Sequence, residues 1–74
     1  MSQARVMVVW RDQLGRQVAH VTQGIAQTSV GLRAAYFAET VVGAITTGFP
    51  RFQCAVKEVE KRLSGAGIRA VRTM

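Results

Sequence analysis

Apolar and polar residues follow one another with different spacings along the chain, and these spacings predict its elements. Residues 4–10 form a short, valine-rich run that ends at Trp10, which indicates a buried strand. In residues 16–29 apolar side chains recur at intervals of three and four, which predicts one face of a helix that stops near Gly31. Val18, Val21 and Ile25 form that face, and Leu14 precedes it.

The second half of the chain predicts a hairpin, a helix and a closing strand. Residues 32–40 and 41–49 are rich in aromatic and β-branched residues, which favours two strands joined by a turn near residues 39–42, with Gly43 at a bulge. Pro50 fits the first turn of a helix whose apolar stripe is Phe52, Ala55, Val56, Val59 and Leu63. The glycine-containing stretch 64–67 ends that helix, and residues 68–74 alternate as a last strand.

This order, β–α–β–β–α–β, is the ferredoxin-like arrangement. The sequence therefore predicts an α+β domain over residues 1–74 with a four-stranded antiparallel sheet. Because each β–α–β half has a right-handed crossover, both helices would pack on one face of this sheet. The other face stays open, and an uncovered face with apolar and aromatic residues needs a partner, a ligand or nucleic acid.

Composition and charge then restrict the class of protein. The chain has 74 residues, of which 49% are apolar, so a core is possible. Such a small domain buries only about 60% of its unfolded surface, and partner chains often make up the deficit. The net charge of +6 fits nucleic acid, an acidic partner or anionic ligands, while the scattered arginines equally fit a soluble basic surface.

The sequence also bears on location. Its first apolar run is broken at once by Arg11 and Asp12, so we expect no secretory signal peptide. No segment reaches the roughly 18–20 apolar residues of a membrane span, so we expect no membrane partner. The single cysteine, Cys54, excludes an intrachain disulfide and suits a reducing compartment, so we expect a cytoplasmic protein.

The residues themselves resemble a known family. The segment VMVVWRDQLGRQVAHVTQGIAQTSVGL, residues 6–32, is similar to the start of an ACT domain, in which a first strand enters a D/N-x-x-G loop before a helix. The loop motif here is Asp12-Gln13-Leu14-Gly15. The segment AVKEVEKRLSGAGIRAVRTM, residues 55–74, is similar to the second helix, turn and closing strand of that family.

The resemblance implies a regulatory module and not an enzyme. ACT domains bind an amino acid or a similar effector where two domains pair, so the expected partners are a second copy as a homodimer, a larger metabolic enzyme and a small-molecule effector. No cofactor or metal is implied. By position the ligand-binding residues would be Arg11, Asp12, Gln13, Leu14 and Gly15, with Gly31 nearest to a second contact. A carboxylate binds an α-amino group, and N–H groups at a helix start bind an α-carboxylate.

Two alternatives remain open from the residues. Tyr36, Phe37 and the arginines are compatible with a sheet surface that binds nucleic acid. Alternatively, the chain is a structural subunit that only assembles with copies of itself. His20 lacks a catalytic partner and Cys54 fits a packing role, so no catalytic residue is predicted.

Overall fold

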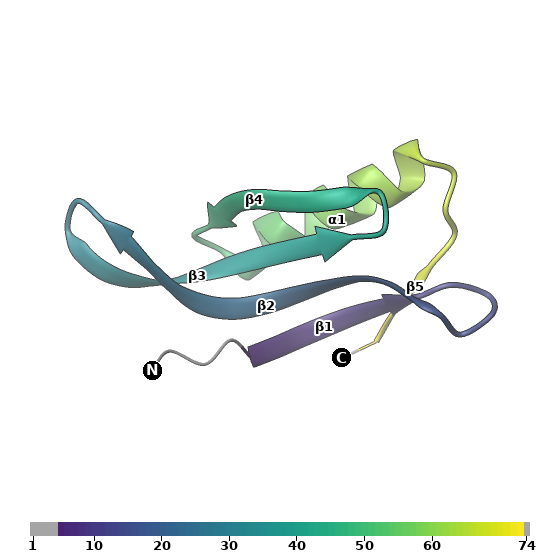
Figure 1. Ribbon diagram of the computed structural model, residues 1–74, viewed down its shortest axis with the longest axis horizontal. Coiled ribbons are helices and arrows are strands. Elements are labelled where there is room, and N and C mark those ends of the chain that lie inside the picture. The colour runs from purple at the N-terminus through teal and green to yellow at the C-terminus, as the bar shows by residue number, and fades with distance from the viewer. Residues whose placement is uncertain (1–4, 74) are drawn as a thin grey trace.

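The computed structural model of the chain describes residues 5–73, with the side chains of all of these except Thr46 and Thr47. Five strands form one sheet in the order β4-β3-β2-β1-β5, and every neighbouring pair is antiparallel (Figure 1). The elements along the chain are β1 (Arg5–Arg11), β2 (Gln17–Thr28), β3 (Gly31–Thr40), β4 (Gly43–Phe49), α1 (Phe52–Gly65) and β5 (Val71–Thr73).

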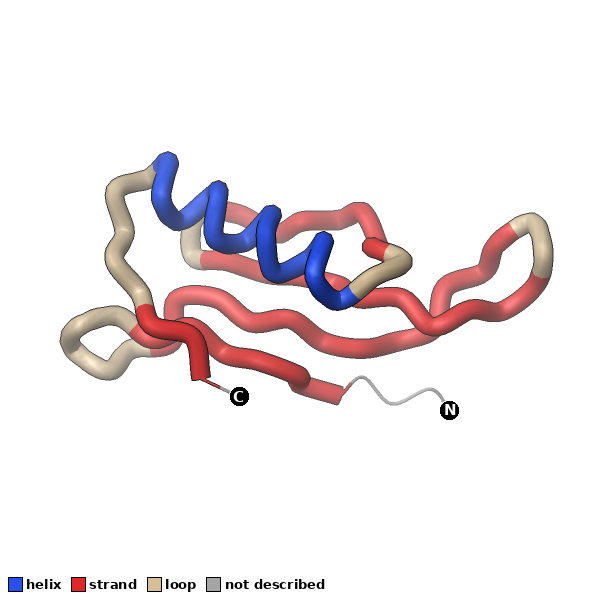
Figure 2. The backbone as a smooth tube through the Cα atoms, turned by 180° about the vertical axis from the view of Figure 1, so that it is seen from behind, coloured by secondary structure: helices blue, strands red, loops and turns tan. Residues whose placement is uncertain are grey.

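The helix α1 lies across one face of the sheet and carries the chain from one edge strand to the other. It follows β4 at one edge and precedes β5 at the opposite edge. Figure 2 shows the helix in front of the strands, whereas Figure 1 looks at the opposite face. Within residues 5–73 no helix is long and apolar enough to cross a bilayer.

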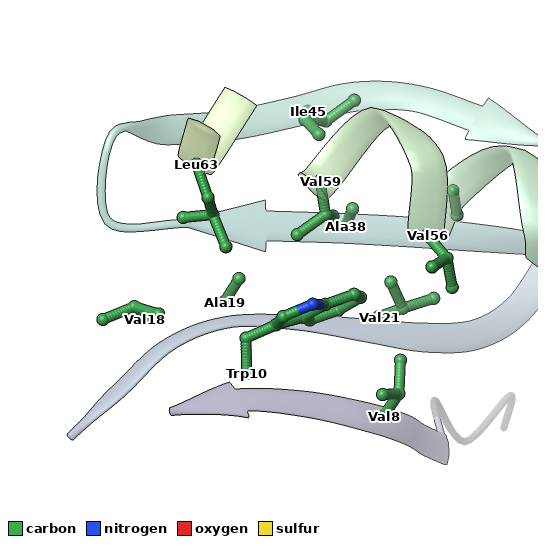
Figure 3. Close-up of a cluster of buried hydrophobic side chains, with 11 residues drawn as sticks. Val8, Trp10, Val18, Ala19, Val21, Ala38, Ile45, Val56, Val59 and Leu63 are labelled. Atoms are coloured by element: carbon green, nitrogen blue, oxygen red, sulfur yellow. The ribbon is translucent and has the colours of Figure 1, made fainter. Parts of the chain in front are cut away.

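The core lies between α1 and the sheet, with Trp10 at its centre (Figure 3). Trp10 is 1% exposed, and its indole Nε1 donates a hydrogen bond of 3.4 Å to Glu60 on the helix. The remaining buried members of the cluster are Val8, Val18, Ala19, Val21, Ala38, Ile45, Ala55, Val56, Val59 and Leu63. The apolar stripe predicted for the second helix therefore does face the sheet.

The ferredoxin-like prediction is wrong. The observed order is β–β–β–β–α–β, a mostly β fold with one helix among the described residues, in place of βαββαβ with two helices. The segment predicted as a first helix, residues 16–29, is the strand β2. The Asp12–Gly15 loop therefore leads into a strand and not into a helix, and Gly31 ends no helix.

Two physical reasons explain why β2 is a strand. It carries five β-branched residues and a glycine, which are poor helix formers, in the list Val18, Val21, Thr22, Gly24, Ile25 and Thr28. It is also central, with β1 on one side and β3 on the other. Hydrogen bonds to a neighbouring strand on each side favour the strand. They outweigh the helical spacing, which only three apolar residues satisfy.

The prediction for the second half is largely confirmed. The hairpin of β3 and β4 turns at Val41 and Val42 as predicted. Pro50, however, precedes the N-cap Arg51 and does not lie in the first turn of α1, which begins at Phe52. Gly43 does not lie at the predicted bulge but closes the turn opposite Thr40. The register shift between β3 and β4 lies between Tyr36 and Ala38. The last strand is shorter than predicted and spans only Val71–Thr73.

Candidate functional site

The loop predicted to bind an effector is the turn between β1 and β2. One carboxylate oxygen of Asp12, Oδ1, accepts hydrogen bonds of 2.9 Å from the backbone N–H groups of Leu14 and Arg16. The other, Oδ2, lies 2.9 Å from the Arg16 guanidinium Nε. Arg11 donates to the carbonyl of Gly15 at 3.0 Å, and Gly15 has a φ of 79°. The structure thus brings residues 11–15 together.

The carboxylate of Asp12 is already satisfied by its own turn. The backbone N–H of Arg16 is the main cause that holds the pKa of Asp12 below its usual value, with smaller contributions from the Arg16 side chain and the Leu14 N–H. A groove of about 340 Å³ beside the turn is lined by Asp12, Gln13, Leu14, Arg16, Gly67, Ile68 and Arg69. Amino-acid binding here stays a prediction, and the observed contacts of Asp12 are those of a structural turn.

Gly31 lies far from that loop. It has a φ of 111° and closes the turn between β2 and β3, at the opposite end of the long hairpin (Figure 1). Since the β1–β2 turn lies at the other end of the sheet, the structure does not bring Gly31 together with Asp12. A single small effector would therefore not contact both Gly31 and Asp12.

The two adjacent aromatic residues of β3 point to opposite faces. Tyr36 lies on the helix side, where its ring is 5.7 Å from that of Phe52 in an edge-to-face arrangement. Phe37 lies on the face that α1 does not cover. Only one of the two aromatic residues that favoured a binding surface is therefore available there.

We call this uncovered surface the open face. Strand pairing places His20 opposite Glu39 and Thr22 opposite Phe37 on it. By the alternation and pairing of the strands, its members include Val6, Val9, Arg11, His20, Thr22, Gly24, Ala26, Arg33, Ala35, Phe37, Glu39, Val71 and Thr73. The Nδ1 of His20 lies 3.1 Å from the side-chain nitrogen of Gln17.

The ring of Phe37 fits between two glycines on the neighbouring strands. A Cβ atom on Gly24 of β2 would lie 3.1 Å from its Cε2, and one on Gly48 of β4 would lie 3.0 Å from its Cε1. The same position at Gly48 is 3.5 Å from the Cβ of Ala35, which is 5% exposed although no helix covers it. The ring thus spreads across the sheet and shelters Ala35, while Phe37 itself stays partly exposed.

Charged groups lie towards both ends of the open face. Arg33 is on β3, two alternations before Phe37, and Arg11 is at the end of β1. Glu39 is exposed on the same face. The other described cations lie elsewhere, among them Lys57 on α1 and Arg62, which pairs with Glu58 at 3.0 Å as its spacing predicts.

Sequence reasoning missed the glycine pair and the repeated turn pattern. Asp12-x-x-Gly15 is followed by Thr28-x-x-Gly31 and Thr40-x-x-Gly43. All three are hairpin turns in which the first side chain bonds the turn backbone. This recurrence is visible in the sequence and would have identified the D-x-x-G motif as a turn between strands.

No protein-family model matches the chain, and no curated protein or solved structure matches it significantly. Among the described residues, no group of three or more His, Cys, Asp and Glu side chains is placed to hold a metal ion. A proposal for the function therefore depends on the open face and on the charge of the chain.

Proposed function

We propose that the chain is a module that binds single-stranded nucleic acid on the open face of its sheet. The observation that carries this proposal is the position of Phe37, a partly exposed ring spread over Gly24 and Gly48 on a face without a helix. Because every base has a π-face, an aromatic ring on an open sheet stacks with a base irrespective of sequence.

The charge of the chain supports this proposal. Nucleic-acid phosphates attract a protein of net charge +6. The two arginines of the open face, Arg11 and Arg33, lie on either side of the Phe37 ring. The negative charge of Glu39 offsets part of their positive charge, so we expect the open face to be moderately basic. Replacing that carboxylate, as in Glu39→Gln, is expected to strengthen binding.

Anisotropy of a fluorescently labelled single-stranded oligothymidylate at low salt tests the stacking role. Phe37→Leu keeps an apolar side chain but removes the ring, and we expect affinity to fall at least about fivefold, since stacking of one base contributes about 1–3 kcal/mol. Phe52→Leu is the matched control, because Phe52 lies on the helix side against Tyr36. It should lower the melting temperature without changing the affinity of the folded protein.

Salt dependence tests the phosphate contacts. Arg33→Gln is expected to reduce the slope of log affinity against log salt by about 0.7, the value for one phosphate contact on a single strand. Lys57→Gln removes the same charge from the outer side of α1 and should leave the slope unchanged. If the wild type gives no anisotropy change at low salt, or if Phe37→Leu binds as tightly as the wild type, the proposal is wrong.

A further inference from the structure

Glu39 differs from the other acidic residues of the chain because its carboxylate has no partner. The chain has four acidic residues in all. Asp12 accepts hydrogen bonds from its own turn, Glu58 forms an ion pair on α1, and Glu60 accepts from an indole N–H. The exposed carboxylate of Glu39 forms no hydrogen bond or ion pair with a described residue. On the open face such a group repels phosphates, which lowers affinity unless it binds a donor of the nucleic acid.

His20 lies directly opposite Glu39 on the neighbouring strand β2. The Cβ atoms of such a pair are about 4.5–5.5 Å apart, so one ligand can contact both side chains. The side-chain nitrogen of Gln17 lies 3.1 Å from Nδ1 of His20. Because an amide NH₂ only donates, Nδ1 is the acceptor, and the proton of the neutral ring is on Nε2. The pair therefore presents one donor, the His20 Nε2–H, beside two acceptor oxygens.

This pair lies apart from the stacking position on Phe37. The ring of Phe37 extends over Ala35, and Ala35 precedes Glu39 by four residues of β3, which is about 13 Å along a strand. A base stacked on the ring therefore leaves Glu39 uncovered. A hollow of about 270 Å³ adjoins the pair, and its lining includes Gln17, His20 and Glu39. The open face thus offers a second subsite, for another nucleotide of the same strand.

The Watson–Crick edge of guanine matches the hydrogen-bonding groups of this subsite. That edge presents the O6 acceptor followed by two adjacent donors, N1–H and the N2 amino group. Adenine and cytosine place one amino donor next to an acceptor nitrogen, and thymine has a single N–H between two carbonyls. Only guanine can donate to both oxygens of Glu39 while it accepts from the His20 Nε2–H. Cytosine presents the same order of one donor and two acceptors to guanine in a base pair.

We propose that Glu39 selects guanine at this second subsite, with His20 as the second contact. The inference rests on the proposed function, because it assigns a base to one position of a bound single strand. It also gives Glu39→Gln opposite effects on two strands. The substitution strengthens binding of thymidylate by removing repulsion. It weakens binding of a guanine strand, because a neutral amide offers one acceptor and an NH₂ group that faces a donor.

Anisotropy of labelled single strands at low salt tests the selection with the wild-type chain alone. Thymidine alternates with guanosine, inosine or adenosine in three strands, so that every register places a purine near the subsite. Lithium chloride is the salt, because lithium ions do not support four-stranded guanine structures. Inosine lacks only the N2 amino group of guanosine. We expect the guanine strand to bind about tenfold more tightly than the inosine strand, through one hydrogen bond to a charged group. The adenine strand should bind no better than the inosine strand.

Glu39→Gln then tests the residue. We expect this variant to bind the guanine and inosine strands equally, and to bind oligothymidylate more tightly than the wild type does. Glu58→Gln is the matched control, since it removes the same charge from α1 on the other side of the sheet, and it should keep the preference for guanine. Circular dichroism confirms that both variants are folded.

The possible outcomes separate guanine selection from nucleic-acid binding itself. A wild type that binds oligothymidylate but does not distinguish guanine from inosine overturns the selection and leaves the proposed function standing. A preference that persists in folded Glu39→Gln also overturns it, because another residue would then contact the guanine edge. A wild type that binds none of the strands contradicts the proposed function, and guanine selection falls with it.

Discussion

Two turns of this molecule share one sequence pattern and one set of hydrogen bonds but differ in their surroundings. In Thr28-Ser29-Val30-Gly31 the threonine hydroxyl donates to the glycine carbonyl at 2.8 Å and accepts from the Val30 N–H at 3.3 Å. In residues 40–43 the same two bonds measure 2.8 and 3.1 Å. The first turn is the exposed tip of the β2–β3 hairpin, whereas Thr40 is 7% exposed.

The difference teaches that local chemistry sets the turn and that burial sets its energetic weight. Both glycines have a positive φ, 111° at Gly31 and 136° at Gly43, which other residues rarely adopt. The backbone requirement is thus met in the same way twice. The turn at residues 28–31 lies beyond the rest of the sheet and α1. We therefore expect it to contribute little to the stability of the folded chain.

The largest expected effect comes from a matched pair on β2. Val21 is fully buried and Ile25 is 55% exposed, and both point to the helix side of the sheet. Val21→Ala is expected to lower the free energy of unfolding by about 2 kcal/mol, through lost burial and the cavity left behind. For a domain of this size that corresponds to a fall of roughly 8–16 °C in melting temperature.

Ile25→Ala should change that free energy by less than about 0.5 kcal/mol in dilute monomer. Urea unfolding followed by circular dichroism measures both variants. Equal effects of the two variants would contradict the contrast between the end of the β2–β3 hairpin and the rest of the sheet.

A smaller effect is expected at the two threonines themselves. Thr40→Val keeps the side-chain shape but leaves the Val42 N–H and the Gly43 carbonyl without their partner in a partly buried turn. We expect a loss of about 1–2 kcal/mol. Thr28→Val removes the same bonds where water replaces them, and its effect should stay within about 0.5 kcal/mol. Thermal unfolding distinguishes the two variants, and a larger effect of Thr28→Val would show that the turn at the end of the β2–β3 hairpin contributes more to stability than the turn at residues 40–43.

The sequence predicts the second half of this fold better than the first, for a physical reason. In α1 the apolar stripe spans five positions and agrees with Pro50 just before the helix and glycines at its end, so local signals reinforce one another. In residues 16–29 the apolar spacing favoured a helix while β-branched residues and Gly24 opposed it. The outcome depended on pairing with β1 and β3, which are contacts distant in sequence.

The candidate sites show the same limit. The grouping of residues 11–15 follows from their adjacency in the sequence, and the distance of Gly31 from them follows from the replacement of a helix by a strand. Phe37 was a candidate from its residue type. Its placement over Gly24 and Gly48 required the register of three strands, and a one-residue slip would have moved it to the helix side.

The smallest expected effect concerns the third turn, where Asp12 stands in place of threonine. The N–H of Arg16, and then the Arg16 side chain and the Leu14 N–H, hold the pKa of Asp12 below its unfolded value. The unfolded chain therefore binds this proton more readily than the folded chain does. The stabilisation is present above the unfolded pKa, near 3.8, and is lost as the pH falls through the folded pKa.

Asp12→Asn removes this titration and keeps the shape of the side chain. We expect the wild type to be slightly more stable than the variant at pH 7, and the difference to shrink below about pH 4. Urea unfolding at a series of pH values measures it. Because the backbone N–H of Arg16 is the largest cause of the lowered pKa, 1 M salt should remove only the part due to the charge of Arg16. A difference that vanishes entirely in salt would show that the ion pair, and not the turn backbone, stabilises the carboxylate.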